Sequence, residues 1–162
     1  MANRSRTRIG DIFCVKIDGK RVRYFQYVAD DLTQLNSQVI RVFKKSFRIA
    51  ERLDWRQLVN GEVEFYAHVF LKIGSKLRYW EKIANVPEIG KMEVLFRNSE
   101  DYGNPNIKIS ENWHVWKINE PFVKVGRLGG GNRRAEIGVV IAPDSIVHRM
   151  KVGDYDFVYP GY

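Results

Sequence analysis

The sequence predicts an α+β fold that is predominantly β, built as a strongly bent antiparallel sheet or a partly open barrel with one or two short helices. Apolar and polar residues alternate with a period of two along most of the chain, and no long run has helical spacing. Turn-forming residues such as Asp18-Gly19 and Gly103-Asn104-Pro105 separate the alternating segments. This pattern predicts about eight or nine short strands.

The first half of the chain predicts a hairpin, two further strands and a short helix. Phe13, Val15 and Ile17 alternate before the Asp18-Gly19 turn, as is typical of a hairpin. Asp54 is a favourable N-cap, and Asn60-Gly61 is a typical helix stop. The predicted elements are strands over 13–17, 22–28, 38–44 and 63–73, with one or two helical turns within 46–60.

The second half predicts more short strands and one further helical turn. The segment 76–84 is ambiguous, and 126–134 is a glycine-rich connection. Pro143-Asp144-Ser145 favours the start of a helical turn that runs to Met150. The predicted strands cover 92–97, 113–118, 122–125, 137–141 and 155–159.

Composition and length place the chain among ordinary globular proteins. Its 162 residues are 44% hydrophobic, 28% charged and 13% aromatic, which excludes intrinsic disorder because the aromatic rings need a core. No apolar run approaches the roughly 18 residues of a transmembrane helix. We expect one domain over 1–162, with 1–8 as a disordered basic tail. The basic N-terminus leads into no apolar stretch, so we expect a cytoplasmic protein without a membrane partner.

The formal charge of +8 is concentrated near the N-terminus. Residues 1–60 hold 13 basic and 6 acidic groups, whereas 61–120 hold 8 and 9, and 121–162 hold 6 and 4. Such an excess is typical of a nucleic-acid footprint or of a surface for an acidic protein. A solvated basic face of a β-sheet is the interpretation that we prefer, because the basic residues alternate with apolar ones instead of clustering.

The residues give little support to catalysis, so we expect no enzyme, metal or cofactor. His68, His114 and His148 stand apart from one another and from any metal-ligand spacing. Cys14, the single cysteine, lies in an apolar strand and is expected to be a structural thiol. The glycine-rich segment 126–134 resembles a phosphate-binding loop but lacks the Lys-Ser/Thr end of a P-loop, and a flexible hairpin loop explains it as well.

Aromatic and basic residues alternate at 21–25 and at 113–117, as on stacking platforms for single-stranded nucleic acid and on protein interfaces. Alternation places Tyr24 on the face opposite Phe25 and Tyr27, and predicts that one of these two sets points outward. The candidate partner-binding residues are Arg21, Arg23, Tyr24, Arg41, Trp113, Trp116, Arg133 and Arg134.

Two segments carry a resemblance to a known family. The segment 8–20 reads RIGDIFCVKIDGK and precedes an aromatic strand that ends YFQYV at 24–28. The segment 77–87 reads LRYWEKIANVP, and a short strand with Phe96 follows it. Over about residues 8–100 the chain therefore resembles the immunity protein 26 family, although Phe25 and Ala84 stand where that family often has glycine.

The resemblance implies a cytoplasmic bacterial antidote that binds and neutralises a cognate polymorphic toxin, with no catalytic residue and no cofactor. The positive charge predicts that this toxin is not a basic nuclease, or that the contact avoids the N-terminal sheet, because a cationic partner would be repelled. The alternative is a small nucleic-acid-binding barrel that uses Arg21, Arg23, Arg41, Lys44 and Lys45 on phosphates.

Overall fold

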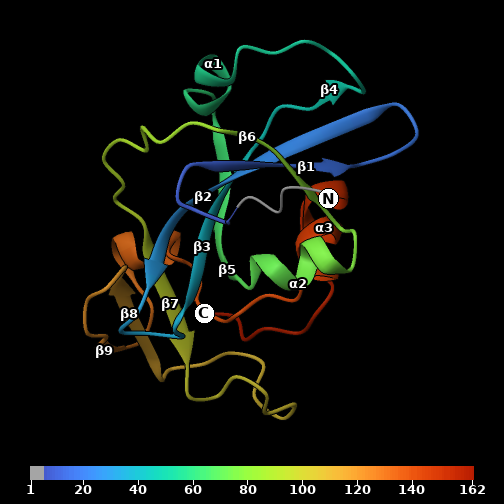
Figure 1. The fold of residues 1–162 in the computed structure, drawn as a ribbon. Coiled ribbons are helices and arrows are strands. Elements are labelled where there is room, and N and C mark those ends of the chain that lie inside the picture. The colour runs from blue at the N-terminus through green and yellow to red at the C-terminus, as the bar shows by residue number, and fades with distance from the viewer. Residues whose placement is uncertain (1–5) are drawn as a thin grey trace.

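Two β-sheets and three short α-helices make up residues 6–162, the part of the chain that the computed structural model describes (Figure 1). The larger sheet has the order β5-β3-β2-β1-β6, with β4 paired to β2. The smaller sheet has the order β10-β7-β8-β9. The strands of the larger sheet are β1 (Asp11–Lys16), β2 (Arg21–Asp31), β3 (Ser37–Phe43), β4 (Phe47–Arg48), β5 (Val63–Val69) and β6 (Glu81–Asn85). Those of the smaller sheet are β7 (Leu95–Ser99), β8 (Trp113–Lys117), β9 (Val123–Gly126) and β10 (Glu136–Ile137).

The predicted α+β class with a predominance of β is confirmed, although the strands form two open sheets. All pairings within the larger sheet are antiparallel, and β10 joins β7 in the parallel sense. The hairpin predicted at Asp18-Gly19 is present. The Asp18 carboxylate accepts the N–H groups of Lys20 and Arg21 at 2.7 and 2.8 Å, which fixes the turn and the register Phe13↔Phe25.

Both faces of the larger sheet are covered, so the prediction that one aromatic set of β2 points outward is wrong. Phe25 and Tyr27 lie in a core shared with α2 (Leu71–Lys76) and α3 (Pro143–Val152). Tyr24 lies in a second core, beneath α1 (Trp55–Val59). Farther along that second face the smaller sheet packs on the larger one through Val28, Val39, Phe96 and Trp116.

The helix α1 confirms its predicted boundaries, whereas α2 corrects a predicted strand. Asp54 caps α1 by accepting the N–H of Arg56 at 3.0 Å. The strand predicted over 63–73 ends at Val69, and the chain then turns into α2. Gly74 of this helix lies against the Trp80 ring, where an added Cβ would come within 1.9 Å of a ring carbon. Close packing on Trp80 thus stabilises a helix in a segment whose two-residue apolar alternation predicted a strand.

The C-terminal part differs from the prediction in two strands. The helical turn predicted from Pro143 extends to ten residues and ends at Gly153, which has φ 91°. The strand predicted over 137–141 is reduced to β10, after which Ile141 donates its N–H to the His68 carbonyl at 2.8 Å. The segment 155–159 forms no strand in the described chain, since Tyr155 and Phe157 stack on each other and pack against the α3 core.

The predicted glycine-rich connection contains a short 3₁₀ helix, η1 (Gly130–Arg134). Of the predicted basic tail, residues 1–5 lie outside the described residues. Arg8 is placed, and its N–H donates to the Asp11 carboxylate at 2.9 Å. No helix within 6–162 has the length and apolar character needed to cross a membrane.

Candidate functional site

Five of the eight residues selected from the sequence are buried inside the protein. They are Arg23, Tyr24, Arg41, Trp113 and Trp116. Arg21, Arg133 and Arg134 are exposed. When both faces of a strand are covered, its polar side chains form hydrogen bonds within the protein. The alternation pattern does not show whether a face is covered.

Arg23 joins three elements beneath the larger sheet. Its guanidinium donates to the Phe43 carbonyl at 2.7 Å and to the Met150 carbonyl of α3 at 2.8 Å, and it lies 3.3 Å from the Glu64 carboxylate. Only 6% of the residue is exposed. These bonds tie β2 to β3, β5 and α3, so the side chain stabilises the fold.

Arg41 has a comparable structural role on the opposite face. Its guanidinium donates twice to the Gln26 side-chain oxygen, at 2.7 and 2.9 Å, and once to the Ile89 carbonyl at 3.2 Å. Gln26 in turn donates to the Val86 carbonyl at 2.8 Å. The network holds the segment after β6 against the sheet.

The exposed Arg133, in η1, lies beside Tyr162. Its guanidinium stands 5.5 Å from the centre of the Tyr162 ring, and Arg97 stands 5.2 Å from the same centre. Arg97 also lies 5.7 Å from the centre of the Trp113 ring. The glycine-rich segment therefore contacts Tyr162 through Arg133. The structure does not bring Arg133 together with Arg21.

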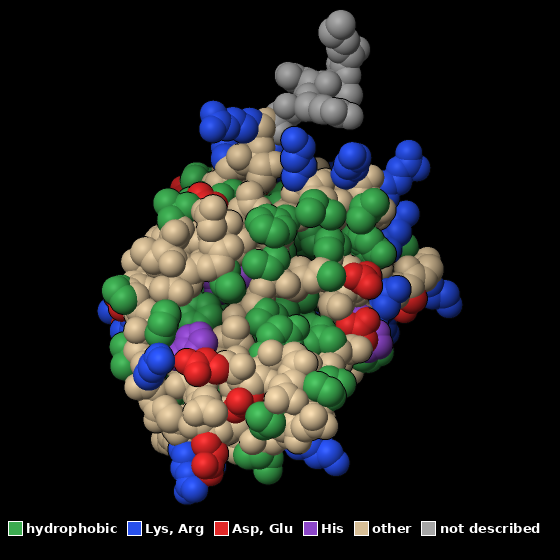
Figure 2. All heavy atoms as spheres, turned by 90° about the horizontal axis from the view of Figure 1, so that it is seen from below, with side chains coloured by type: hydrophobic (Ala, Val, Ile, Leu, Met, Phe, Trp, Pro, Cys, Tyr) green, Lys and Arg blue, Asp and Glu red, His purple; other side chains and the backbone are tan. Residues whose placement is uncertain are grey.

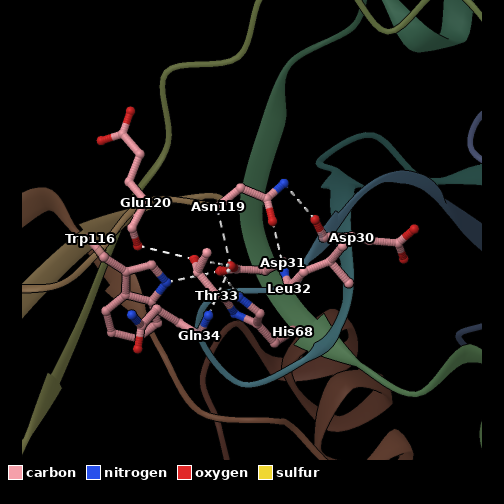
Figure 3. Close-up of polar contacts among 9 residues, drawn as sticks. All are labelled: Asp30, Asp31, Leu32, Thr33, Gln34, His68, Trp116, Asn119 and Glu120. Carbon is pink, nitrogen blue, oxygen red and sulfur yellow. Dashed lines mark hydrogen bonds and ion pairs between the residues drawn. The ribbon is translucent and has the colours of Figure 1, made fainter.

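A buried polar cluster around Asp31 forms where β2 meets the smaller sheet, and we call it the Asp31 centre (Figure 3). One carboxylate oxygen accepts from His68 Nε2 and from Trp116 Nε1, each at 2.9 Å. The other accepts from the N–H of Asn119 at 3.1 Å and of Gln34 at 3.3 Å. Asp31 and His68 are completely buried.

Charge in the Asp31 centre resides on the carboxylate. Burial alone would raise the pKa of Asp31, but hydrogen bonds from His68, Trp116 and the two backbone groups outweigh it and lower that pKa. Burial also lowers the pKa of His68, and the Asp31 carboxylate offsets this only in part. His68 is therefore neutral, and its hydrogen bond to Asp31 assigns the Nε2–H tautomer.

Ser37, His68 and Asp31 are the residue types of a hydrolytic triad, and strand register places them on one face of the sheet. No hydrogen bond joins Ser37 to His68 among the described residues, and Ser37 Oγ and His68 Nδ1 are both buried without a partner. The His68 ring instead meets the Phe96 ring edge-on, with centroids 4.2 Å apart. The contacts present join the two sheets to each other through the Asp31 carboxylate.

The second feature is an exposed surface on α2 and the segment that follows it, which we call the α2 surface. Its apolar members, between 36% and 59% exposed, are Phe70, Ile73, Leu77, Tyr79 and Ile83. Its cations are Lys72, Lys76 and Arg78, all exposed. Figure 2, which looks at the molecule from below, shows hydrophobic side chains gathered near the centre of the face in view and Lys and Arg side chains grouped along its upper margin.

The α2 surface arises because the helix is apolar on two sides. Leu71 and Gly74 face the core, whereas Phe70, Ile73 and Leu77 follow one another at helical spacing on the exposed side. Glu81 is the only carboxylate between 70 and 83. It pairs with Cys14, next to the core under α1, and so lies over the opposite face of the sheet.

A cleft of about 580 Å³ continues the α2 surface at Ile83. Arg6, Arg8 and Lys82 line it, and Asp11 is nearly fully buried beside it. The Asp11 carboxylate accepts from the side chain of Asn85 at 2.9 Å and lies 3.3 Å from Lys82 Nζ. Basic groups therefore extend beyond the helix on the same side of the sheet.

The sequence interpretation missed both features. Asp31 and His68 are 37 positions apart, so only the strand pairings bring them together. The α2 surface had a local signal, because Phe70, Ile73 and Leu77 have i, i+3, i+7 spacing. That signal was hidden by the two-residue alternation of Val69, Leu71 and Ile73 across the same segment.

Comparisons with known proteins give no relative. No family model matches the chain. No curated protein matches it. No solved structure matches it.

Proposed function

We propose that this chain is a non-catalytic binding protein of the immunity type, which captures and neutralises a cognate bacterial toxin in the cytoplasm of the producing cell. The observation that supports this proposal is that the two segments that resemble the immunity protein 26 family lie side by side in the larger sheet. The first forms β1 and β2, and the second forms β6, which pairs with β1 on its other edge. Segments about 50 residues apart thus form one unit of three adjacent strands.

Trp80, the tryptophan of the second segment, packs on the first. Its ring meets Phe25 edge-on, with centroids 5.0 Å apart, and its Nε1 donates to the Leu71 carbonyl at 3.1 Å. A resemblance that falls on a shared core supports a common scaffold better than one scattered over loops. The two departures from the family pattern, Phe25 and Ala84, are both accommodated within packed clusters.

The positions of the arginines favour protein binding over the nucleic-acid alternative. That alternative relied on five basic side chains, and three of them, Arg23, Arg41 and Lys44, donate to protein groups. An exposed surface with an apolar stripe and basic neighbours instead has the composition of a protein interface.

Co-expression tests the proposal directly. The chain is produced in a bacterial host together with each toxin domain encoded beside its gene. We expect it to restore growth against one of them and to co-purify with that domain as a stoichiometric complex. An unrelated toxin serves as the control, since neutralisation depends on a matched interface. If the chain protects against none of the neighbouring toxins, the proposal is wrong.

A further inference from the structure

We propose that the α2 surface is the docking site of this protein and that its occupant is an acidic protein surface that also carries apolar side chains. The inference rests on the proposed function and deepens it, since that occupant is the binding face of the toxin. It also agrees with the expectation from net charge that the toxin is not cationic.

The exposed apolar stripe supplies the area that such a partner would bury. Ile73 and Leu77 are 47% and 59% exposed, although each lies within one turn of a buried residue of α2, Leu71 or Gly74. Exposed apolar groups in a contiguous patch are typical of interaction sites. Phe70 and Tyr79, at either end, are aromatic residues of the kind enriched in the centre of interfaces.

Charge selects the partner. Within the described chain no ion pair involves Lys72, Lys76 or Arg78. The single carboxylate of the segment, Glu81, lies over the other face of the sheet. Three cations beside an apolar stripe therefore complement a partner with carboxylates around an apolar centre.

The backbone at Arg78 gives an independent reason to assign the side chain a role. Arg78 follows the C-cap of α2 with φ 62°, in the left-handed region where glycine is the usual residue. A non-glycine residue there is strained, and such strain is concentrated at functional positions. The strain is maintained at an exposed cation that makes no ion pair in the described structure.

Two other anionic occupants fit less well. A membrane-bound helix inserts a continuous apolar face, whereas α2 has six residues and its exposed apolar groups are partly covered by their neighbours. A nucleic acid would place phosphates on cations and bases on aromatic rings, whereas the centre of the stripe, Ile73 and Leu77, is aliphatic.

The test measures binding to the toxin domain against which the chain protects. Ile73→Glu and Leu77→Glu should each weaken binding by about 30-fold or more, as at interface hot spots. Val158→Glu is the matched control, since Val158 is 90% exposed and the charge change is the same. If the wild type protects and both α2 variants bind as tightly as the control, the docking site is wrong although the proposed function stands.

A second arm does not depend on a toxin. Its probes are a synthetic helical peptide with Leu and Glu on one face, vesicles of phosphatidylglycerol and a single-stranded oligonucleotide. We expect the peptide alone to bind, with NMR shifts confined to α2 and loss of binding in Leu77→Glu. Binding of vesicles or oligonucleotide by this face, peptide shifts elsewhere, or no peptide binding would each overturn the inference.

Discussion

Charged groups in the Asp31 centre and on the α2 surface differ in what they contact. The Asp31 carboxylate is completely buried and accepts from two side chains and two backbone N–H groups at 3.3 Å or less. Lys72, Lys76 and Arg78 are exposed and form no ion pair in the described structure. Substitutions in the Asp31 centre should therefore lower the free energy of unfolding, whereas substitutions on the α2 surface should weaken binding and leave stability almost unchanged.

The largest effect is expected at Asp31. Asp31→Ala leaves His68, Trp116 and two backbone N–H groups without an acceptor, and should lower the free energy of unfolding by about 3–5 kcal/mol. Urea denaturation followed by tryptophan fluorescence measures this loss. Asp144→Ala is the control, since Asp144 is an exposed residue of α3. Equal losses in the two variants would show that the Asp31 centre does not join the sheets.

A smaller loss is expected at Arg23. Arg23→Met keeps the apolar stem but leaves the Phe43 and Met150 carbonyls without a donor, which should cost about 2 kcal/mol of unfolding free energy. Arg21→Met, two positions earlier on the same strand, is the matched exposed control and should change stability by less than about 0.5 kcal/mol. Paired urea curves give both values, and a loss at Arg21 as large as that at Arg23 would contradict the structural role.

Local chemistry allowed some of these features to be predicted from the sequence. The Asp54 cap and the Asp18-Gly19 turn depend on groups within three residues, so both were predicted correctly. Arg23 and Arg41 were interpreted as surface groups because alternation tells which residues share a face but not whether that face is covered. The covering elements, α3 for Arg23 and the segment after β6 for Arg41, lie far away in sequence.

Acid should weaken the Asp31 centre in two stages. His68 has a lowered pKa, so below about pH 6.5 the unfolded chain binds a proton that the folded chain does not, and stability falls. Asp31 also has a lowered pKa, so its contribution is complete above about pH 4 and is lost as the pH falls through its folded value.

Urea midpoints between pH 7 and pH 5 measure the first stage. In His68→Gln the slope of stability against pH should become smaller, since the amide still donates to Asp31 but does not titrate. It should not vanish, because burial also lowers the pKa of His114. His148→Gln is the control, as His148 lies outside the Asp31 centre. A slope in His68→Gln equal to that of the wild type would show that His68 does not carry this dependence.

The smallest change in stability is expected at Arg78, and a comparison with Asn119 separates the two regions because both residues have left-handed backbones. Arg78 has φ 62° and Asn119 has φ 63°. Asn119 uses its side chain inside the fold, donating to the Asp30 carbonyl at 2.8 Å and accepting from the Leu32 N–H at 2.7 Å. Arg78 has no side-chain hydrogen bond or ion pair in the described chain, so its strain is not offset by such contacts.

Arg78→Gly should therefore keep or raise the free energy of unfolding, by no more than about 1 kcal/mol, since relief of the left-handed strain is partly offset by the freedom of glycine in the unfolded chain. Asn119→Gly relieves the same strain but loses two hydrogen bonds, and should lower stability by about 1 kcal/mol or more. Toxin binding should weaken in Arg78→Gly and persist in Arg78→Lys, which keeps the charge. If Arg78→Gly is as stable as the wild type and binds the toxin as tightly, the left-handed backbone at Arg78 has no functional reason. The strain then no longer supports docking on the α2 surface.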